Sequence, residues 1–173
     1  MILTGKEIHR RMGRDIIIHP FYPKRINPNS YNLRLGSKIL IYRSDRGRSI
    51  FHDPDPDDEF NLPETGERVV FDPGNLILAE TLEYTETHNL VPMLEGRSSI
   101  GRQFCLVHVS AGFGDNGFKG KWTLELVPLA PMALWYGMDI CQIYYHTLRG
   151  RKTKYSGRYN ENHGVQTVID GGM

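Results

Sequence analysis

The stretch EGRSSIGRQFCLVHVSAGFGDNGFKGKWTLEL, residues 95–126, combines an Arg-Ser-Ser turn, a glycine-rich loop with one acid and an alternating strand. An arginine followed by two hydroxyls at the start of a short helical turn offers a phosphate a charged fork, O–H donors and unpaired backbone N–H groups. In the alternating run, Trp122 and Leu124 point to one face, and Thr123 and Glu125 point to the other. Glu125 is therefore expected to project away from the apolar layer, toward whatever the neighbouring loops enclose.

Outside this stretch, 10 prolines and 18 glycines cut the apolar sequence into brief segments, which is typical of an all-β domain. One helix is predicted at residues 5–12, because Thr4 and Glu7 form a T-x-x-E capping box and Gly13 can end the helix. The run DPDPDDE at residues 53–59 is expected to form an exposed acidic loop. So many short segments favour a jelly roll or a related barrel. Strands are predicted at residues 15–18, 31–35, 38–43, 68–71, 76–82, 90–94, 104–109, 121–127 and 140–147.

The composition limits the classes of protein to which the chain can belong. With 173 residues, of which 39% are hydrophobic, it is long enough for one domain with a sizeable core. Its net charge of +1 gives no reason to expect a nucleic acid or a membrane as partner, and it favours a small ligand. Cys105 and Cys141 lie in apolar runs without metal-ligand spacing, so both are expected to be buried, reduced thiols. The charged first residues are unlike a signal peptide and no apolar run is long enough to span a bilayer, so a cytoplasmic protein is expected.

The segment from residue 149 onward differs from the rest of the chain, because it offers almost nothing to bury. Its basic residues are Arg149, Arg151, Lys152, Lys154 and Arg158. One interpretation is a solvated, mobile end, which is common at termini. The other is a lid that closes over a phosphorylated ligand and expels water from it. The expected organisation is a β domain at residues 1–148 and a flexible C-terminal lid of the same domain at residues 149–173.

Four segments resemble motifs of the dCTP deaminase family, which belongs to the dUTPase-like superfamily. They are INPNSYNLRLG at 26–36, EGRSSIGR at 95–102, HVSAGFGDNGFKGKWTLEL at 108–126 and YSGRYNENHG at 155–164. The second and third segments are long and specific. The chain departs from the family's usual residues at Gly114, commonly Ile, at Asn116, commonly Pro or Ala, and at Asn162, commonly Gln. The resemblance implies an all-β, dUTPase-like distorted jelly roll and a homotrimer whose active sites lie between subunits.

Deamination at C4 of cytosine requires a water nucleophile, a base that takes its proton, and an acid that protonates the ring and the departing amine. Most deaminases use zinc, with H-x-E and P-C-x-x-C motifs that are absent from this sequence. A zinc-free route requires one carboxylate that shuttles the protons and hydrogen bonds that position the water. Glu125 is the candidate carboxylate, and the resemblance implies the same role for it. Ser98 lies one helical turn before Arg102, so both side chains can share a face and meet the same water or Glu125.

The resemblance also implies roles for the other candidate residues. Ser98 would help to hold the water, Arg102 would orient the carboxylate, and Asp115 would contact the sugar and activate the water that attacks the phosphate chain. The implied phosphate-binding residues are Arg97, Ser98, Ser99, Lys154, Tyr159 and Asn162. The implied base- and sugar-binding residues are His108, Val109, Ala111, Gly112, Asp115 and Phe118. The implied ligands are dCTP and dUTP as substrates, Mg2+ carried on the triphosphate, and dTTP as an inhibitor that acts near His108.

Each candidate also has an ordinary structural interpretation. Glu125 alone fits the exposed half of a half-buried strand, Asp115 a turn acid and His108 a packed histidine. The residues AGF at 111–113 resemble the members that both deaminate dCTP and cleave its triphosphate, so the expected products are dUMP and pyrophosphate. The alternatives are a deaminase that releases dUTP, a dUTPase alone, and a nucleotide-binding regulator without the chemistry.

Overall fold

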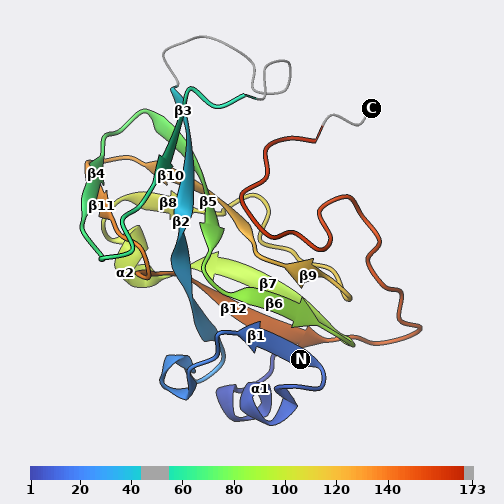
Figure 1. Cartoon of the computed structure of the whole chain (residues 1–173). Helices are drawn as coiled ribbons and strands as arrows, with labels where there is room; N and C mark the ends of the chain where they lie inside the picture. Colours follow the sequence, from blue (N-terminus) through green and yellow to red (C-terminus); the bar gives the residue numbers. More distant parts are fainter. Residues whose placement is uncertain (44–54, 170–173) are drawn as a thin grey trace.

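The computed structural model describes residues 1–43 and 55–169. Strands dominate the described part and wrap into a distorted, nearly closed barrel, which confirms the all-β prediction (Figure 1). The helical segments are α1 (Gly5–Arg11), the short α2 (Ser98–Gly101) and a 3-10 turn at Pro23–Arg25. The strands are β1 (Ile16–His19), β2 (Tyr31–Arg43), β3 (Asp58–Asn61), β4 (Val69–Phe71), β5 (Asn75–Thr81), β6 (Tyr84–Thr87), β7 (Leu90–Gly96), β8 (Cys105–Val107), β9 (Lys119–Gly120), β10 (Thr123–Pro128), β11 (Met132–Leu134) and β12 (Asp139–Thr147).

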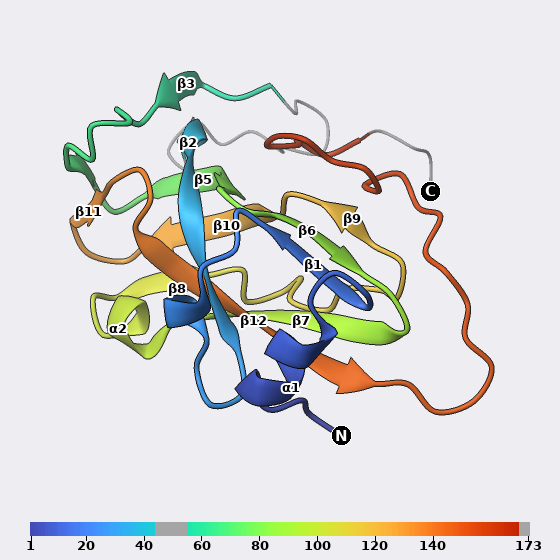
Figure 2. The ribbon, with the colours of Figure 1, turned by 60° about the horizontal axis from the view of Figure 1, so that its bottom comes forward.

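The strands of the described part pair in three antiparallel sheets (Figure 2). The largest has the order β7-β12-β2-β5-β10-β8, with β3 paired to β2, and the smaller ones are β1-β6-β9 and β11-β4. Strand β10 lies between β5 and β8, so its register is fixed from both sides. Glu125 pairs with Leu78 of β5, and Leu126 pairs with both Ile77 of β5 and Val107 of β8. A slip by one residue would turn Glu125 into the core, which the two pairings prevent.

Helix α1 begins where the capping signal predicts. The Thr4 hydroxyl accepts a hydrogen bond from the Glu7 backbone N–H at 3.3 Å, and the buried Ile8 anchors the helix to the core. The helix ends at Arg11, one residue earlier than predicted, and Gly13 follows in the left-handed region at φ 75°. The Glu7 carboxylate pairs with Arg10 and Arg11. The side-chain cap of the helix is therefore the hydrogen bond to Thr4 alone.

The core lies inside the barrel and follows the alternation of the strands. On β10, Leu124 and Leu126 are completely buried while Thr123 and Glu125 are half-buried on the other face, as predicted. Cys105 and Cys141 are free and buried, which confirms the expectation of structural thiols. Burial raises the pKa of Cys105 to about 11 and raises that of Cys141 as well. Among the described residues, neither helix has the length and apolar character needed to cross a membrane.

The predicted strands differ from the observed ones where polar residues or glycine disturb the pattern. The segments predicted at 31–35 and 38–43 form one strand, β2, because Gly36 continues the strand close against the Glu80 side chain. The pairing of β2 with β5 shifts register between Leu35 and Ile39 instead of breaking. The sequence prediction missed β3, β6, β9 and β11. Strand β6, with the sequence YTET, escapes an apolar pattern because its inward residues are two buried threonines.

The acidic run at 53–59 is only partly described, since residues 53 and 54 lie outside the described residues. Asp58 and Glu59 belong to the edge strand β3, so the prediction of a loop is wrong for them. Both are exposed, as expected. Their carboxylates pair with Arg43 and Lys38 of β2, and charge is a common feature of edge strands.

Residues 149–169, here called the tail, leave β12 and run back along β9 and β10 (Figure 1). The Lys121 N–H donates to the Asn162 carbonyl at 2.8 Å, and the Glu161 N–H donates to the Lys119 carbonyl at 2.8 Å. Further along, the Gln166 N–H donates to the Thr123 hydroxyl at 3.0 Å. The tail of this chain is therefore docked on the barrel by backbone hydrogen bonds.

Candidate active site

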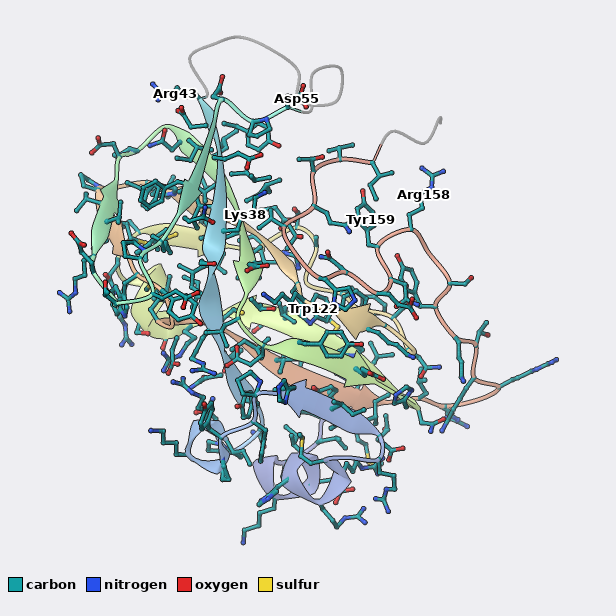
Figure 3. The ribbon with its side chains drawn as sticks, in the orientation of Figure 1. Lys38, Arg43, Asp55, Trp122, Arg158 and Tyr159 are labelled. Carbon is teal, nitrogen blue, oxygen red and sulfur yellow. The ribbon has the colours of Figure 1, made fainter. Side chains whose placement is uncertain are left out.

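A cavity of about 570 Å³ lies between the outer face of β5 and β10, the loop at residues 108–118, and the tail. In Figure 3, Trp122 lies on the barrel and Tyr159 on the tail that runs beside it. Much of the lining is apolar, and Leu76 and Leu78 of β5 contribute to it. Among the described residues that line the cavity, the acidic ones are Asp115 and Glu125. The fold thus brings two carboxylates, predicted to serve different steps, to one cavity.

Glu125 is held at the cavity by its strand and by His108. The His108 Nδ1 atom lies 2.6 Å from Glu125 Oε2, although the two groups are not aligned as a hydrogen bond. His108 is 5% exposed and the Glu125 side chain 40% exposed, so the imidazole forms a buried backing for a carboxylate that meets the cavity. His108 adopts a left-handed φ of 52°, and its backbone N–H donates to the Glu125 carbonyl at 2.8 Å. This backbone hydrogen bond holds the two residues side by side.

The loop that carries Asp115 is shaped by two glycines that pack closely. A Cβ on Gly114 would collide with the Trp122 ring and with Pro92. The Trp122 ring therefore occupies the space that a side chain at position 114 would need. A Cβ on Gly112 would collide with the carbonyl of Leu94 on β7. The close approach of this loop to β7 therefore requires glycine at position 112. Ala111, Asp115 and Phe118 line the cavity, with Asp115 exposed and Phe118 packed on Trp122 at a ring distance of 4.5 Å.

The Arg-Ser-Ser turn lies elsewhere in this chain. Arg97 is the N-cap of α2, and Ser98, Ser99 and Arg102 are exposed. Arg97 pairs with Asp139 of β12 at 3.3 Å. No residue of 97–102 is among the described residues that line the Glu125 cavity. The sequence prediction that Ser98 and Arg102 meet Glu125 is therefore not fulfilled within a single chain.

The tail supplies part of the cavity wall. Tyr159 and Asn162, both predicted to bind phosphate, line the cavity, whereas Lys154 is exposed and outside it. The Asn162 amide is already used, since its Nδ2 donates to the Lys121 carbonyl at 3.1 Å and its Oδ1 accepts from the Gly164 N–H at 3.0 Å. In this arrangement Asn162 holds the tail on the barrel. The base-binding candidates Val109 and Gly112 also lie outside this cavity and border a neighbouring hollow beside β7.

Sequence reasoning missed several residues of the cavity wall. Tyr155, Gln166, Thr167 and Val168 come from the tail, and Tyr42, Leu76 and Leu78 come from β2 and β5. Tyr155 begins the quoted segment at 155–164 but was given no role, and the other residues lie outside the quoted motifs. The pairing of Leu78 with Glu125 depends on strand register, which the sequence pattern alone did not reveal.

In the described ranges, no group of three or more His, Cys, Asp or Glu gathers as a metal-binding set. The carboxylates at the cavity, Asp115 and Glu125, supply hard oxygen ligands, and such ligands suit Mg2+ bound mainly by substrate phosphates. The residues present therefore fit a metal ion that arrives with a nucleotide.

Comparison with known proteins gives consistent results across the chain. A family model described as dCTP deaminase-like matches residues 2–148. A protein of Leptospira biflexa named "dCTP deaminase, dUMP-forming" is 53% identical over 170 residues, which cover 98% of this chain and 95% of that protein. A protein of the same name from Clostridium acetobutylicum is 51% identical, over 98% of this chain and 96% of the relative.

Among solved structures, the 2'-deoxycytidine 5'-triphosphate deaminase of Agrobacterium tumefaciens superposes with a TM-score of 0.66 at 20% identity. The match covers 83% of this chain and 47% of that chain, so this chain spans about half the length of the solved one. At this level of identity the likeness concerns the fold alone.

Proposed function

The chain belongs to the dCTP deaminase-like family, and we propose that it deaminates dCTP and cleaves its triphosphate, giving dUMP, pyrophosphate and ammonia. The observation that carries the proposal is the presence of Glu125 and Asp115 at one cavity, because two hydrolytic steps need two sites of water activation. The names of relatives at about half identity over nearly the whole chain support both steps.

In the first step, Glu125 takes a proton from a water that attacks C4 of the cytosine ring. The carboxyl group passes this proton to the ring nitrogen, then takes the second proton from the new C4 hydroxyl and gives it to the departing amine, so that ammonia leaves and uracil remains. His108 confines the carboxylate from behind at 2.6 Å, and the apolar lining from β5 limits access of bulk water. The zinc-free route is supported by the absence of a zinc-deaminase motif in the sequence.

In the second step, Asp115 positions a water for in-line attack on the phosphate chain. Asp115 is exposed at the cavity and makes no side-chain hydrogen bond or ion pair with the described residues, so its carboxylate is available to a water and to the sugar. Mg2+ bound to the triphosphate would neutralise charge that develops on the phosphate oxygens. Attack forms the new P–O bond of dUMP and releases pyrophosphate.

The proposal includes a second copy of the chain, because the predicted phosphate site at residues 97–102 lies outside the cavity. Its surroundings support such a contact. Phe104, Leu106 and Leu129 are 66%, 46% and 58% exposed beside α2 and along β8, which is the edge strand of the large sheet. In the homotrimer that we propose, α2 of one copy brings Arg97, Ser98, Ser99 and Arg102 to the Glu125 cavity of its neighbour. Light scattering should then report about three times the chain mass of 19.9 kDa.

The test is a time course with purified protein and Mg2+, supplied with dCTP or dUTP and analysed by chromatography. The proposal predicts dUMP and pyrophosphate from the start, with equimolar ammonia and little free dUTP. Accumulation of dUTP without pyrophosphate would show a deaminase only, and cleavage of dUTP without turnover of dCTP would show a dUTPase. Lack of turnover with either nucleotide would indicate a regulator. Addition of dTTP tests the proposed inhibition, and a cytoplasmic location remains part of the proposal.

A further inference from the structure

Asn116, the residue after Asp115, is buried and makes three hydrogen bonds to two separate segments. Its Oδ1 accepts from the Asn89 backbone N–H at 2.7 Å, and its Nδ2 donates to the Thr153 carbonyl at 2.6 Å. Its own carbonyl accepts from the Tyr155 N–H at 2.7 Å. Two of these bonds reach the beginning of the tail, so one residue connects the tail to the turn that carries Asp115.

The turn itself is compact and packs on the tail. The Phe118 N–H donates to the Asp115 carbonyl at 3.2 Å, and the Gly117 N–H donates to the Thr87 carbonyl at 2.8 Å. Gly117 has φ 96°, and a Cβ there would lie 3.2 Å from the Lys154 Cβ atom. The backbone of the turn therefore has little room to move while the tail is docked.

A row of aromatic rings runs from the same part of the tail to the deamination site. Tyr155 contacts Phe118 at 6.4 Å between ring centroids, and Phe118 contacts Trp122 at 4.5 Å. Trp122 in turn meets His108 edge-on at 6.3 Å. These rings rest on the barrel through the Trp122 Nε1–H, which donates to the Thr85 hydroxyl at 2.9 Å. The Glu125 side of the cavity is thus anchored in the barrel, whereas the Asp115 turn has two of its hydrogen bonds on the tail.

We propose that Asn116 is a positioning residue that places Asp115 for phosphate cleavage only while the tail is docked. When residues 153–155 leave the barrel, Asn116 loses two of its three hydrogen bonds, and the turn stays bonded to Thr87 and Asn89 but loses the tail contacts that hold it in its position beside the cavity. Glu125, held by β5, β8 and His108, keeps its place. This inference rests on the proposed function, because it assigns the link to the second hydrolytic step.

The primary test compares Asn116→Ala with a matched variant, Asn160→Ala. Asn160 is an amide of the tail itself that contacts the barrel, since its Oδ1 accepts from the Lys119 N–H at 2.9 Å, and this bond goes to β9 and not to Asn116 or Asp115. Asn116→Ala should release dUTP. The ratio of dUTP to dUMP should rise by roughly tenfold to a hundredfold, since a misplacement of about 1 Å can cost that much. Asn160→Ala should raise the KM for dCTP and keep the wild-type product ratio.

Asn116→Asp provides a second variant of the same shape in case the alanine protein fails to fold. It keeps the acceptor for the Asn89 N–H and removes the donor to the Thr153 carbonyl, so it should also release dUTP. A product ratio equal to that of the wild type in folded Asn116 variants would overturn the proposal.

Hydrogen exchange of the protein without nucleotide provides a readout that needs no activity. Asn116→Ala should speed exchange in residues 113–118 and 153–156, whereas Asn160→Ala should speed it in residues 158–163 and leave 113–118 unchanged. Exchange at the wild-type rate in residues 153–156 of the Asn116 variants would reject the link. If the wild type does not turn over dCTP, the proposed function fails, and exchange alone still decides whether Asn116 links the tail to the turn.

Discussion

The two parts of the predicted site differ in how completely one chain builds them. The first part, Glu125 with His108 and Asp115, gathers around one cavity on the side of the molecule where the tail runs. The second part, the α2 turn with Arg97, Ser98 and Arg102, lies beside β8 and faces outward (Figure 1). Both parts are ordered by contacts within their own chain. Within the described ranges, the first part lines the 570 Å³ cavity and the second part does not.

This difference shows what each part requires. Glu125 is fixed by strand pairing on both sides, so a single chain suffices to orient it. Arg97 is oriented by the carboxylate of Asp139, which also pairs with Arg25, but its guanidinium has no ligand cavity of its own among the described residues. The proposed phosphate site at Arg97 therefore depends on a neighbouring copy that brings a nucleotide to it.

The largest expected effect tests the part that one chain completes. Glu125→Gln keeps the shape of the side chain and removes the proton shuttle, so deamination of dCTP should fall by about two to four orders of magnitude. Nucleotide binding should survive. Ammonia release from dCTP is the measurement, and Glu59→Gln, an exposed carboxylate on β3 paired with Lys38, is the control. Near-normal ammonia release from Glu125→Gln would refute the assignment.

The second prediction tests whether the two parts come from different copies. Glu125→Gln and Arg102→Ala should each be inactive alone, but coexpression in equal amounts should restore activity to about a quarter of the wild type, because a quarter of random contacts join two intact parts. The control pair, Ser98→Ala with Arg102→Ala, carries both lesions on α2 and should show no recovery. If the first pair stays as inactive as its components, the site does not form between copies.

Much of the fold followed from the sequence because local rules determine it. Thr4 marks the beginning of α1 and Gly13 follows its end. The alternation on β10 places Leu124 inside the barrel and Glu125 outside it. Strands such as β6 could not be found in this way, because its buried residues, Thr85 and Thr87, are polar and leave no apolar alternation in the sequence. Thr85, for example, donates to the Gly120 carbonyl at 3.2 Å. A buried polar residue can be recognised as part of the core only when its hydrogen-bond partners are known.

The sequence identified individual residues of the candidate site, but it did not predict their positions relative to one another or their hydrogen-bond partners. Motifs pointed to Glu125, Asp115 and Tyr159, which line the same cavity. They did not reveal that Leu78 faces Glu125, because register depends on distant strands. They also gave Asn162 a role at phosphate, whereas in the structure its amide holds the tail to Lys121 and Gly164. Which of several hydrogen bonds an amide forms depends on neighbours far away in the sequence.

The third prediction concerns the tail, which closes the first part of the site. Truncation after Leu148 removes Tyr159 and the other tail residues from the cavity wall. The KM for dCTP should rise and kcat should fall, so that kcat/KM drops by at least roughly tenfold, because phosphate contacts and water exclusion are lost together. Steady-state kinetics provide the measurement, with circular dichroism as a check on folding. Unchanged kinetics would show that the docked tail has no role in turnover.

The smallest expected effect concerns the second part of the site, at Asp139. Its carboxylate holds Arg97 at 3.3 Å, and both side chains are about 30% exposed, so solvent screens the pair. Ion pairs of this kind contribute about 0.2 to 1 kcal/mol, so Asp139→Asn should raise the KM for dCTP by no more than about fivefold. The kcat should stay near the wild-type value, because Asp139 acts on the nucleotide only through Arg97.

Asp58→Asn, which removes an exposed pair with Arg43 on the edge of the sheet, is the matched control and should leave both constants unchanged. An unaltered KM in Asp139→Asn would show that Arg97 does not depend on Asp139 to bind phosphate. A large loss of kcat with normal folding would instead place Asp139 at the reacting groups, and the division between the two parts of the site would have to be redrawn.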